Sequence, residues 1–266
     1  MLGQFFIDKP HGKFGGINGH GYNLTIGKDF LFDEHGYYGL LFDYGSNTVS
    51  GAAGSGEYDS YSLGLYAGNK NKPGSITGFV SYGLQANKGT AYLPVLGQTA
   101  ESGYDSKTLG IGVEYAYDLD YGKPEELWHV SPYARINFTH YRQKAFREHG
   151  AGVFDRSFGS YSDNYAEGEL GLSFDRSEGT GGYGIRLGYK RILTGERQLM
   201  EVCFAEDECG SLLPVRSWGE GRNHFVAAAY VRHDFSRKWS AGGSLSGDWS
   251  NGGREIGARL DLAYHF

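Results

Sequence analysis

The chain has 266 residues and a formal net charge of -6, and it contains 44 glycines, 21 tyrosines and 16 phenylalanines. No run of about 20 apolar residues could form a transmembrane helix, the aromatic content of 15% is too high for a disordered chain, and the glycines lack the three-residue period of collagen. No basic stripe indicates a nucleic-acid partner, and Met1–Gln4 lacks the features of a secretory signal, so an exported form has lost its signal.

A hydrophobic period of two runs through nearly the whole chain and predicts β-strands. Within 107–119, Leu109 and Val113 are on an apolar face, while Gly112 and Glu114 are on a small or charged face, because successive strand side chains point to opposite sides. A weak first strand is expected at 4–9. The eleven stronger ones are expected, in chain order, at 22–30, 37–46, 59–68, 75–86, 107–119, 128–142, 164–175, 183–193, 223–235, 239–249 and 254–266.

The connections between these strands alternate in length. Short turns are predicted at 31–36, 69–74, 120–127, 176–182 and 236–238, and long polar connections at 47–58, 87–106, 143–163 and 194–222. The alternation ends at the short turn Ser250–Gly253. Outer-membrane barrels combine short periplasmic turns with longer extracellular loops and an even strand number. Counting 4–9 as a strand makes the number twelve and places both chain ends in the periplasm.

Three features favour a membrane barrel over a lipocalin-like barrel or a soluble sandwich, which remain the alternatives. Segments 107–119 and 128–142 exceed the 5–6 residues common in soluble strands. The polar face mixes glycine with charges of both signs, and aromatic residues flank the short turns as in an interfacial girdle. The sequence therefore predicts an all-β, twelve-stranded antiparallel transmembrane β-barrel with long extracellular loops. It would occupy 1–266 as a single domain in the outer membrane of a Gram-negative bacterium.

Charged residues on the polar faces are expected to point into the barrel lumen. They have two interpretations: they line a hydrophilic conduit, or they pair with one another and set the strand register, with water limiting the desolvation cost. The predicted lumen-facing residues are Asp43, Glu114, Arg135, Glu167, Glu169, Arg186, Lys190, Arg232, Asp234, Arg259 and Asp261.

Other chemistry is sparse. Cys203 and Cys209 enclose five residues of the longest predicted outer loop and are disulfide candidates, with free thiols or a metal site as alternatives. The nine histidines form no HExxH pair. His149, Asp155 and Asp163 resemble a rim protease arrangement, but loop polarity explains them better. We expect no catalytic residue, metal or cofactor.

Several segments resemble the translocator domain of classical type V autotransporters. They are His20–Gly27, Asp59–Tyr66, Ser131–Ala134, Gly188–Leu193 and Gly257–Phe266. The last segment also resembles the assembly signal of outer-membrane barrels, which would be carried by Leu260, Leu262, Tyr264 and Phe266.

This resemblance implies a barrel that anchors an upstream passenger domain and helps to deliver it to the cell surface. It also implies a linker helix across the lumen, for which this chain leaves little room before its first strand. The expected partners are outer-membrane lipids, the barrel-assembly machinery and the chain's own passenger, with the barrel monomeric. A free-standing narrow porin and a barrel enzyme of the outer membrane are the alternatives.

Overall fold

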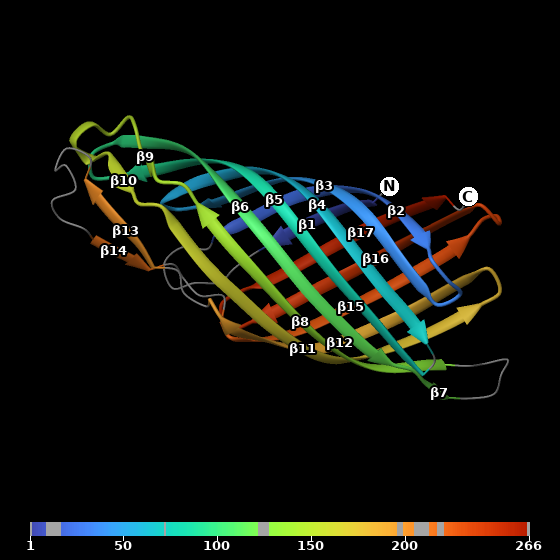
Figure 1. Cartoon of the computed structure of the whole chain (residues 1–266). Coiled ribbons are helices and arrows are strands. Elements are labelled where there is room, and N and C mark those ends of the chain that lie inside the picture. The colour runs from blue at the N-terminus through green and yellow to red at the C-terminus, as the bar shows by residue number, and fades with distance from the viewer. Residues whose placement is uncertain are drawn as a thin grey trace.

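The computed structural model describes residues 2–8, 17–71, 73–121, 128–195, 199–204, 213–216 and 221–264. Within this part of the chain, twelve long antiparallel strands form one closed barrel (Figure 1). The first strand, β1, pairs with β2 on one side and with the last strand, β17, on the other. Farther round, β8 pairs with both β6 and β11, so the sheet is continuous around the barrel.

The barrel strands keep the order of the sequence. They are β1 (Leu2–Asp8), β2 (Asn18–Leu31), β3 (Gly36–Gly51), β4 (Gly54–Asn71), β5 (Gly74–Leu93), β6 (Gln98–Tyr117), β8 (Trp128–Gln143), β11 (Tyr161–Glu178), β12 (Gly181–Thr194), β15 (Asn223–Asp234), β16 (Trp239–Ser250) and β17 (Arg254–Tyr264). A short strand, β7 (Leu119–Tyr121), pairs with the start of β8.

The prediction of twelve strands is confirmed, including the weak one near the amino terminus. That strand matters because a barrel in lipid must pair every backbone N–H and C=O group internally. Without β1, the facing edges of β2 and β17 would lack partners. Closure of the sheet therefore identifies β1 where its side-chain pattern is weak.

The two ends of the barrel differ. Leu2 and Tyr264 lie at the end that also carries the tight β2–β3 and β15–β16 turns, here called the terminal end (Figure 1). The opposite end, called the loop end, carries the connections from β8 to β11 and from β12 to β15. In the β2–β3 turn, backbone amides of His35 and Gly36 donate to Asp33, which holds the pKa of that carboxyl below its usual value.

Two of the four predicted long loops are wrong. The segments predicted as loops at 47–58 and 87–106 are instead mostly strand, and β3–β4 and β5–β6 continue as hairpins to turns at 52–53 and 94–97. The prediction failed because these extensions project beyond the apolar belt, the band of outward-facing apolar side chains around the barrel. Polar residues occur on both of their faces, so the hydrophobic alternation that marks a strand disappears, although the backbone pairing continues.

A small second sheet covers part of the loop end. It has the order β14 (Leu213–Arg216), β13 (Leu199–Phe204), β10 (Arg156–Phe158) and β9 (Phe146–Arg147), so the two long connections meet in it. The ring of Phe146 stacks between Tyr104 of β6 and Phe158, with centroid distances of 4.3 and 4.4 Å. Aromatic stacking therefore joins this sheet to the barrel wall.

Large apolar side chains face outward around the barrel. On β6, Leu109, Ile111 and Val113 are 37%, 49% and 39% exposed, and Leu260 on β17 reaches 70%. Such a continuous apolar surface suits hydrocarbon, whereas a soluble fold would bury it. The only helical element among the described residues is the turn Gly152–Phe154, and no helix there has the length and apolarity to span a membrane.

The inward face is less uniformly polar than the sequence pattern indicated. Leu41, Tyr66 and Phe79 share the inward face of β3, β4 and β5, because each is register-paired with a residue of that face. The ring of Phe79 covers Gly112 of β6, where a Cβ would come within 2.3 Å of it. Aromatic rings lying over glycines stabilise strongly bent sheets, so these rings occupy space that the glycines leave open.

Candidate functional site

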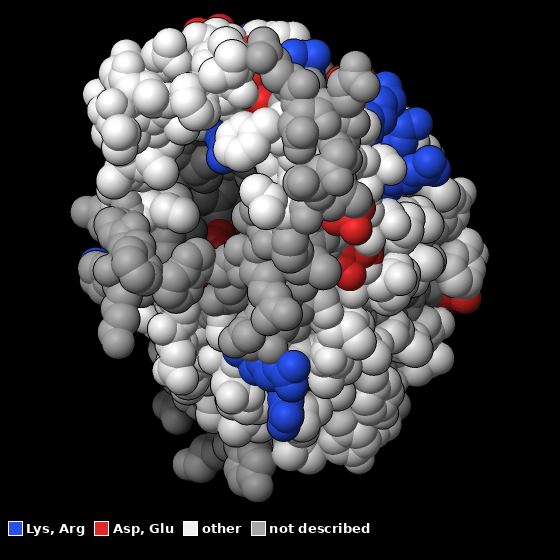
Figure 2. Space-filling view, turned by 90° about the vertical axis from the view of Figure 1, so that its left-hand side faces the viewer, with Lys and Arg blue, Asp and Glu red and all other residues white. Residues whose placement is uncertain are grey.

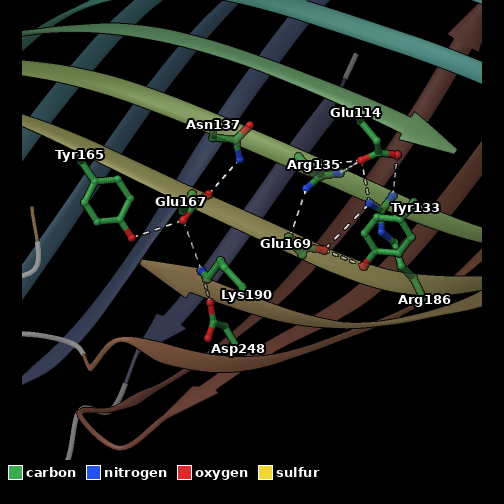
Figure 3. Close-up of polar contacts among 10 residues, drawn as sticks. All are labelled: Glu114, Tyr133, Arg135, Asn137, Tyr165, Glu167, Glu169, Arg186, Lys190 and Asp248. Carbon is green, nitrogen blue, oxygen red and sulfur yellow. Dashed lines mark hydrogen bonds and ion pairs between the residues drawn. The ribbon is translucent and has the colours of Figure 1, made fainter. Parts of the chain in front are cut away.

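The inward charges of β6, β8 and β12 meet in one cluster. Glu114 of β6 accepts hydrogen bonds from Arg135 Nε at 2.7 Å and from Arg186 Nη2 at 2.7 Å (Figure 3). The guanidinium of Arg186 also donates to the second oxygen of Glu114 at 3.1 Å, so this pair is bidentate. Because β8 and β11 lie between β6 and β12, a contact from Glu114 to Arg186 must cross the concave side of the wall.

A second carboxylate completes this central cluster. Glu169 of β11 accepts the hydroxyl hydrogen of Tyr133 at 2.6 Å and lies 3.8 Å from Arg135 and 3.9 Å from Arg186. The Arg186 guanidinium carbon stands 3.5 Å from the centroid of the Tyr133 ring. Two arginines, two glutamates and a tyrosine thus neutralise one another, and this arrangement costs less than isolated charges would.

Tyr133 fits here only because its neighbours are glycines. A Cβ on Gly188 would lie 2.5 Å from the Tyr133 hydroxyl oxygen and 2.9 Å from a Val226 methyl carbon. Tyr133 is 5% exposed and cannot swing away freely. Gly188→Ala is therefore expected to lower the free energy of unfolding by roughly 1–3 kcal/mol through overpacking, measured by urea titration in detergent.

Gly168→Ala is the matched control. Its Cβ would meet nothing closer than 3.9 Å, on Leu193, so a change within about 0.5 kcal/mol is expected. In a Tyr133→Ala background, the cost of Gly188→Ala should become smaller, because only the contact with Val226 would remain below 3.0 Å. An undiminished effect of Gly188→Ala in that background would rule out the Tyr133 contact as the cause.

A second group of charges lies nearer the loop end. Lys190 of β12 bonds Asp248 of β16 and stands 3.9 Å from Glu167 of β11. Glu167 accepts from the Asn137 amide at 2.8 Å (Figure 3). Asp248 also pairs with His224 Nδ1 at 2.6 Å. This group links five strands, from β8 to β16, through side chains alone.

The remaining predicted charges lie apart from these groups. Arg232 pairs with Asp234 at 3.2 Å and Arg259 with Asp261 at 2.5 Å, each between residues two apart on one strand and well exposed towards the terminal end. Asp43 of β3 accepts a hydrogen bond from its register partner Thr25 on the neighbouring β2, away from both groups. The structure therefore places six of the eleven predicted charges in the central cluster or the second group: Glu114, Arg135, Glu167, Glu169, Arg186 and Lys190. The other five lie outside both.

The central cluster and the second group together are here called the charged wall. The sequence analysis did not predict several of its members. Tyr133, Asn137, His224 and Asp248 were not selected, although each lies on the same face as a selected residue. One signal was available for Tyr133, which is register-paired with Gly171, since an aromatic residue opposite a glycine often fills the glycine's space. Using that signal requires the register between β8 and β11, which the sequence of a single strand does not give.

Small side chains of β15 and β16 lie across a cavity from the central cluster. A cavity of about 360 Å³ lies between Arg135, Glu169 and Arg186 on one side and Val226, Ala228 and Ser246 on the other. The second side belongs to β15 and β16, where these three side chains are small and Asp248 lies beside them. The cavity therefore has the paired charges of the central cluster on one side and mostly small side chains on the other.

The other predicted sites are only partly described. Leu260, Leu262 and Tyr264 point outward on β17, whereas Phe266 lies outside the described residues. Cys203 is buried and disulfide-bonded, but Cys209 lies outside the described residues, so their pairing stays a prediction. Asp155 accepts the backbone hydrogen of Ala151 at 2.7 Å. Among the described residues no cluster of His, Cys, Asp and Glu could hold a metal ion.

A closed antiparallel barrel with an apolar exterior and a charged interior defines an outer-membrane β-barrel protein. Residues 2–246 match the family model "Autotransporter beta-domain", so the chain belongs to the autotransporter beta-domain family. Members of this family reside in the Gram-negative outer membrane, carry a linked passenger domain, anchor it there and take part in its translocation by type V secretion. Translocator domains of this kind are generally not enzymes.

Solved structures show the same fold. The translocator domain of autotransporter NalP from Neisseria meningitidis matches with a TM-score of 0.81 and 17% identity, covering 100% of this chain and 87% of that one. The transport unit of AIDA-I from Escherichia coli matches at 0.72 and 14%, covering 100% and 88%. The beta domain of the Bordetella autotransporter BrkA matches at 0.63 and 13%, covering 100% and 98%. The comparison with curated protein sequences gave no match.

Proposed function

We propose that residues 1–266 form a single barrel domain that works as a monomer without catalytic activity and exports its passenger through the charged lumen. The observation that carries this proposal is the compensated charged wall. Its arginines and carboxylates already bind one another, so they offer a polar surface to a passing chain without a strong unpaired charge that would hold it. The loop end faces the cell exterior and the terminal end faces the periplasm.

The chain's partners follow from the same picture. Lipids surround the apolar exterior, and the barrel-assembly machinery reads the outward residues of the last strand, Leu260, Leu262, Tyr264 and Phe266. The lumen-facing roles of the eleven predicted charges, from Asp43 to Asp261, and a Cys203–Cys209 disulfide in the outer loop belong to this proposal. No cofactor is needed for any of these steps.

The test is display of a passenger. A small protease-sensitive reporter joined upstream of residue 1 is expected to become accessible to protease added to intact cells. Tyr264→Ala with Phe266→Ala should reduce both barrel insertion and display, because the assembly machinery would no longer recognise β17. Folding is followed by the altered migration of unheated barrels on gels.

Leu245→Ala is the control for the loss of apolar surface. Leu245 also points outward, on β16, and is 64% exposed, but it lies outside the last strand, so display should persist. A reporter retained in the periplasm beneath a correctly inserted wild-type barrel would refute the export role. Large, steady conductance in planar bilayers together with that result would favour the porin alternative.

A further inference from the structure

Two basic side chains face each other on the outside of the barrel. Lys107 of β6 is register-paired with Arg142 of β8, and both are exposed. Lys107 continues the outward-facing series of Leu109 and Ile111, whose side chains are 37% and 49% exposed. The pair therefore lies one step beyond the apolar belt, towards the loop end.

The local charges compensate this pair only in part. Like charges directly opposite each other on adjacent strands repel. The nearest carboxylate in the next row, Asp105, already binds Lys144 Nζ at 2.7 Å. Three cations and one carboxylate thus give this patch a net charge of +2. By contrast, Glu57 and Lys88 on β4 and β5 form an opposite-charge pair.

Basic side chains also gather visibly along one edge of the loop end (Figure 2). A repulsive pair at the edge of an apolar belt is stabilised by an anion held between the two cations. Arginine presents a planar fork of donors that suits phosphate, and lysine binds phosphate as a point charge. The position of the pair favours a lipid headgroup as the source of that phosphate, because a membrane barrel contacts lipid headgroups where its apolar belt ends.

We propose that Lys107 and Arg142, with Lys144 beside them, bind a phosphate group of a lipid headgroup in the outer leaflet. The acyl chains of that lipid would lie along Leu109 and Phe138 below the pair. The site gives β6 and β8 a fixed lipid neighbour at the loop end. This inference rests on the proposed orientation of the barrel, with the loop end outside.

Lipid A carrying two phosphates is the probe, added to the refolded full-length chain in a zwitterionic detergent. Bound lipid is counted by native mass spectrometry, and folding is checked by gel migration. Lys107→Ser with Arg142→Ser is expected to weaken binding at least tenfold. Arg191→Ser is the matched control, since Arg191 is exposed on β12 opposite Gly168 and Asn223 with no cation facing it, and binding should change less than twofold.

Two further arms identify the ligand. Lipid A stripped of both phosphates should bind at least tenfold more weakly than the diphosphorylated form, and millimolar inorganic phosphate should compete poorly. Unchanged binding by the double variant, or equal binding of the dephosphorylated lipid, would overturn the proposal. Full competition by inorganic phosphate would overturn the lipid assignment.

The passenger-display assay separates this proposal from the export role. The double variant is expected to display the reporter while binding little lipid A, because neither residue faces the lumen. Wild-type lipid binding by a chain that fails to display would refute export and leave the lipid site standing.

Discussion

An arginine at Val113 is expected to destabilise the barrel by about 2–4 kcal/mol, the cost of a cation on the lipid face at the bilayer midplane. Val113 is the middle residue of the outward series from Leu109 to Tyr117 on β6, and it is register-paired with Ile136 of β8 and Gly78 of β5. Its charge could reach neither the lumen nor a nearby carboxylate. Reversible urea unfolding in lipid vesicles measures the change.

Ala86→Arg provides the comparison. Ala86 is exposed on β5 beyond the apolar belt, between Asp59 and Asp105 in the register. An arginine there meets water and two carboxylates, so a change within about 1 kcal/mol is expected. Equal losses at Val113 and Ala86 would mean that the belt on β6 does not contact hydrocarbon.

Removal of the Glu114 charge is expected to have the next largest effect. Glu114→Gln leaves Arg135 and Arg186 close together without the carboxylate that both now bind. Breaking a fully buried ion pair costs about 3–5 kcal/mol. Here the side chains keep 24–35% exposure, so we expect a loss of roughly 1–3 kcal/mol, as for hydrogen bonds to charged groups.

A double-mutant cycle tests the origin of this loss. If repulsion between the two arginines is the cause, Arg186→Leu added to Glu114→Gln should recover part of the stability, with a coupling of roughly 0.5–3 kcal/mol. Glu57→Gln, which removes an exposed carboxylate opposite Lys88, should cost at most about 1 kcal/mol. Additive effects of Glu114 and Arg186 would show that the pair is not coupled.

The charged wall gives both sequence interpretations of the lumen charges a physical basis. Glu114 of β6 binds Arg135 on the neighbouring β8 and Arg186 on β12, two strands beyond β8, which supports the register. Arg135, Glu169 and Arg186 border the cavity against β15 and β16, which supports a polar path. The two interpretations are compatible, because charges that pair with one another remain hydrophilic without strongly attracting a passing segment.

The sequence by itself determined the all-β class, the twelve strands and the outward position of residues such as Leu109, Val113 and Leu260. Alternation with a period of two carries that information residue by residue, wherever one face meets hydrocarbon. The same rule failed in 47–58 and 87–106, because a strand that leaves the membrane keeps its backbone hydrogen bonds but no longer needs an apolar face.

The tertiary structure alone decided which charges meet. Glu114 and Arg186 are 72 residues apart and separated by two strands, so their contact depends on the register and curvature of the whole wall. The same holds for Tyr133 over Gly188, for Phe79 over Gly112, and for Lys107 opposite Arg142. Each depends on cross-strand neighbours, and the pattern within one strand contains no information about those neighbours.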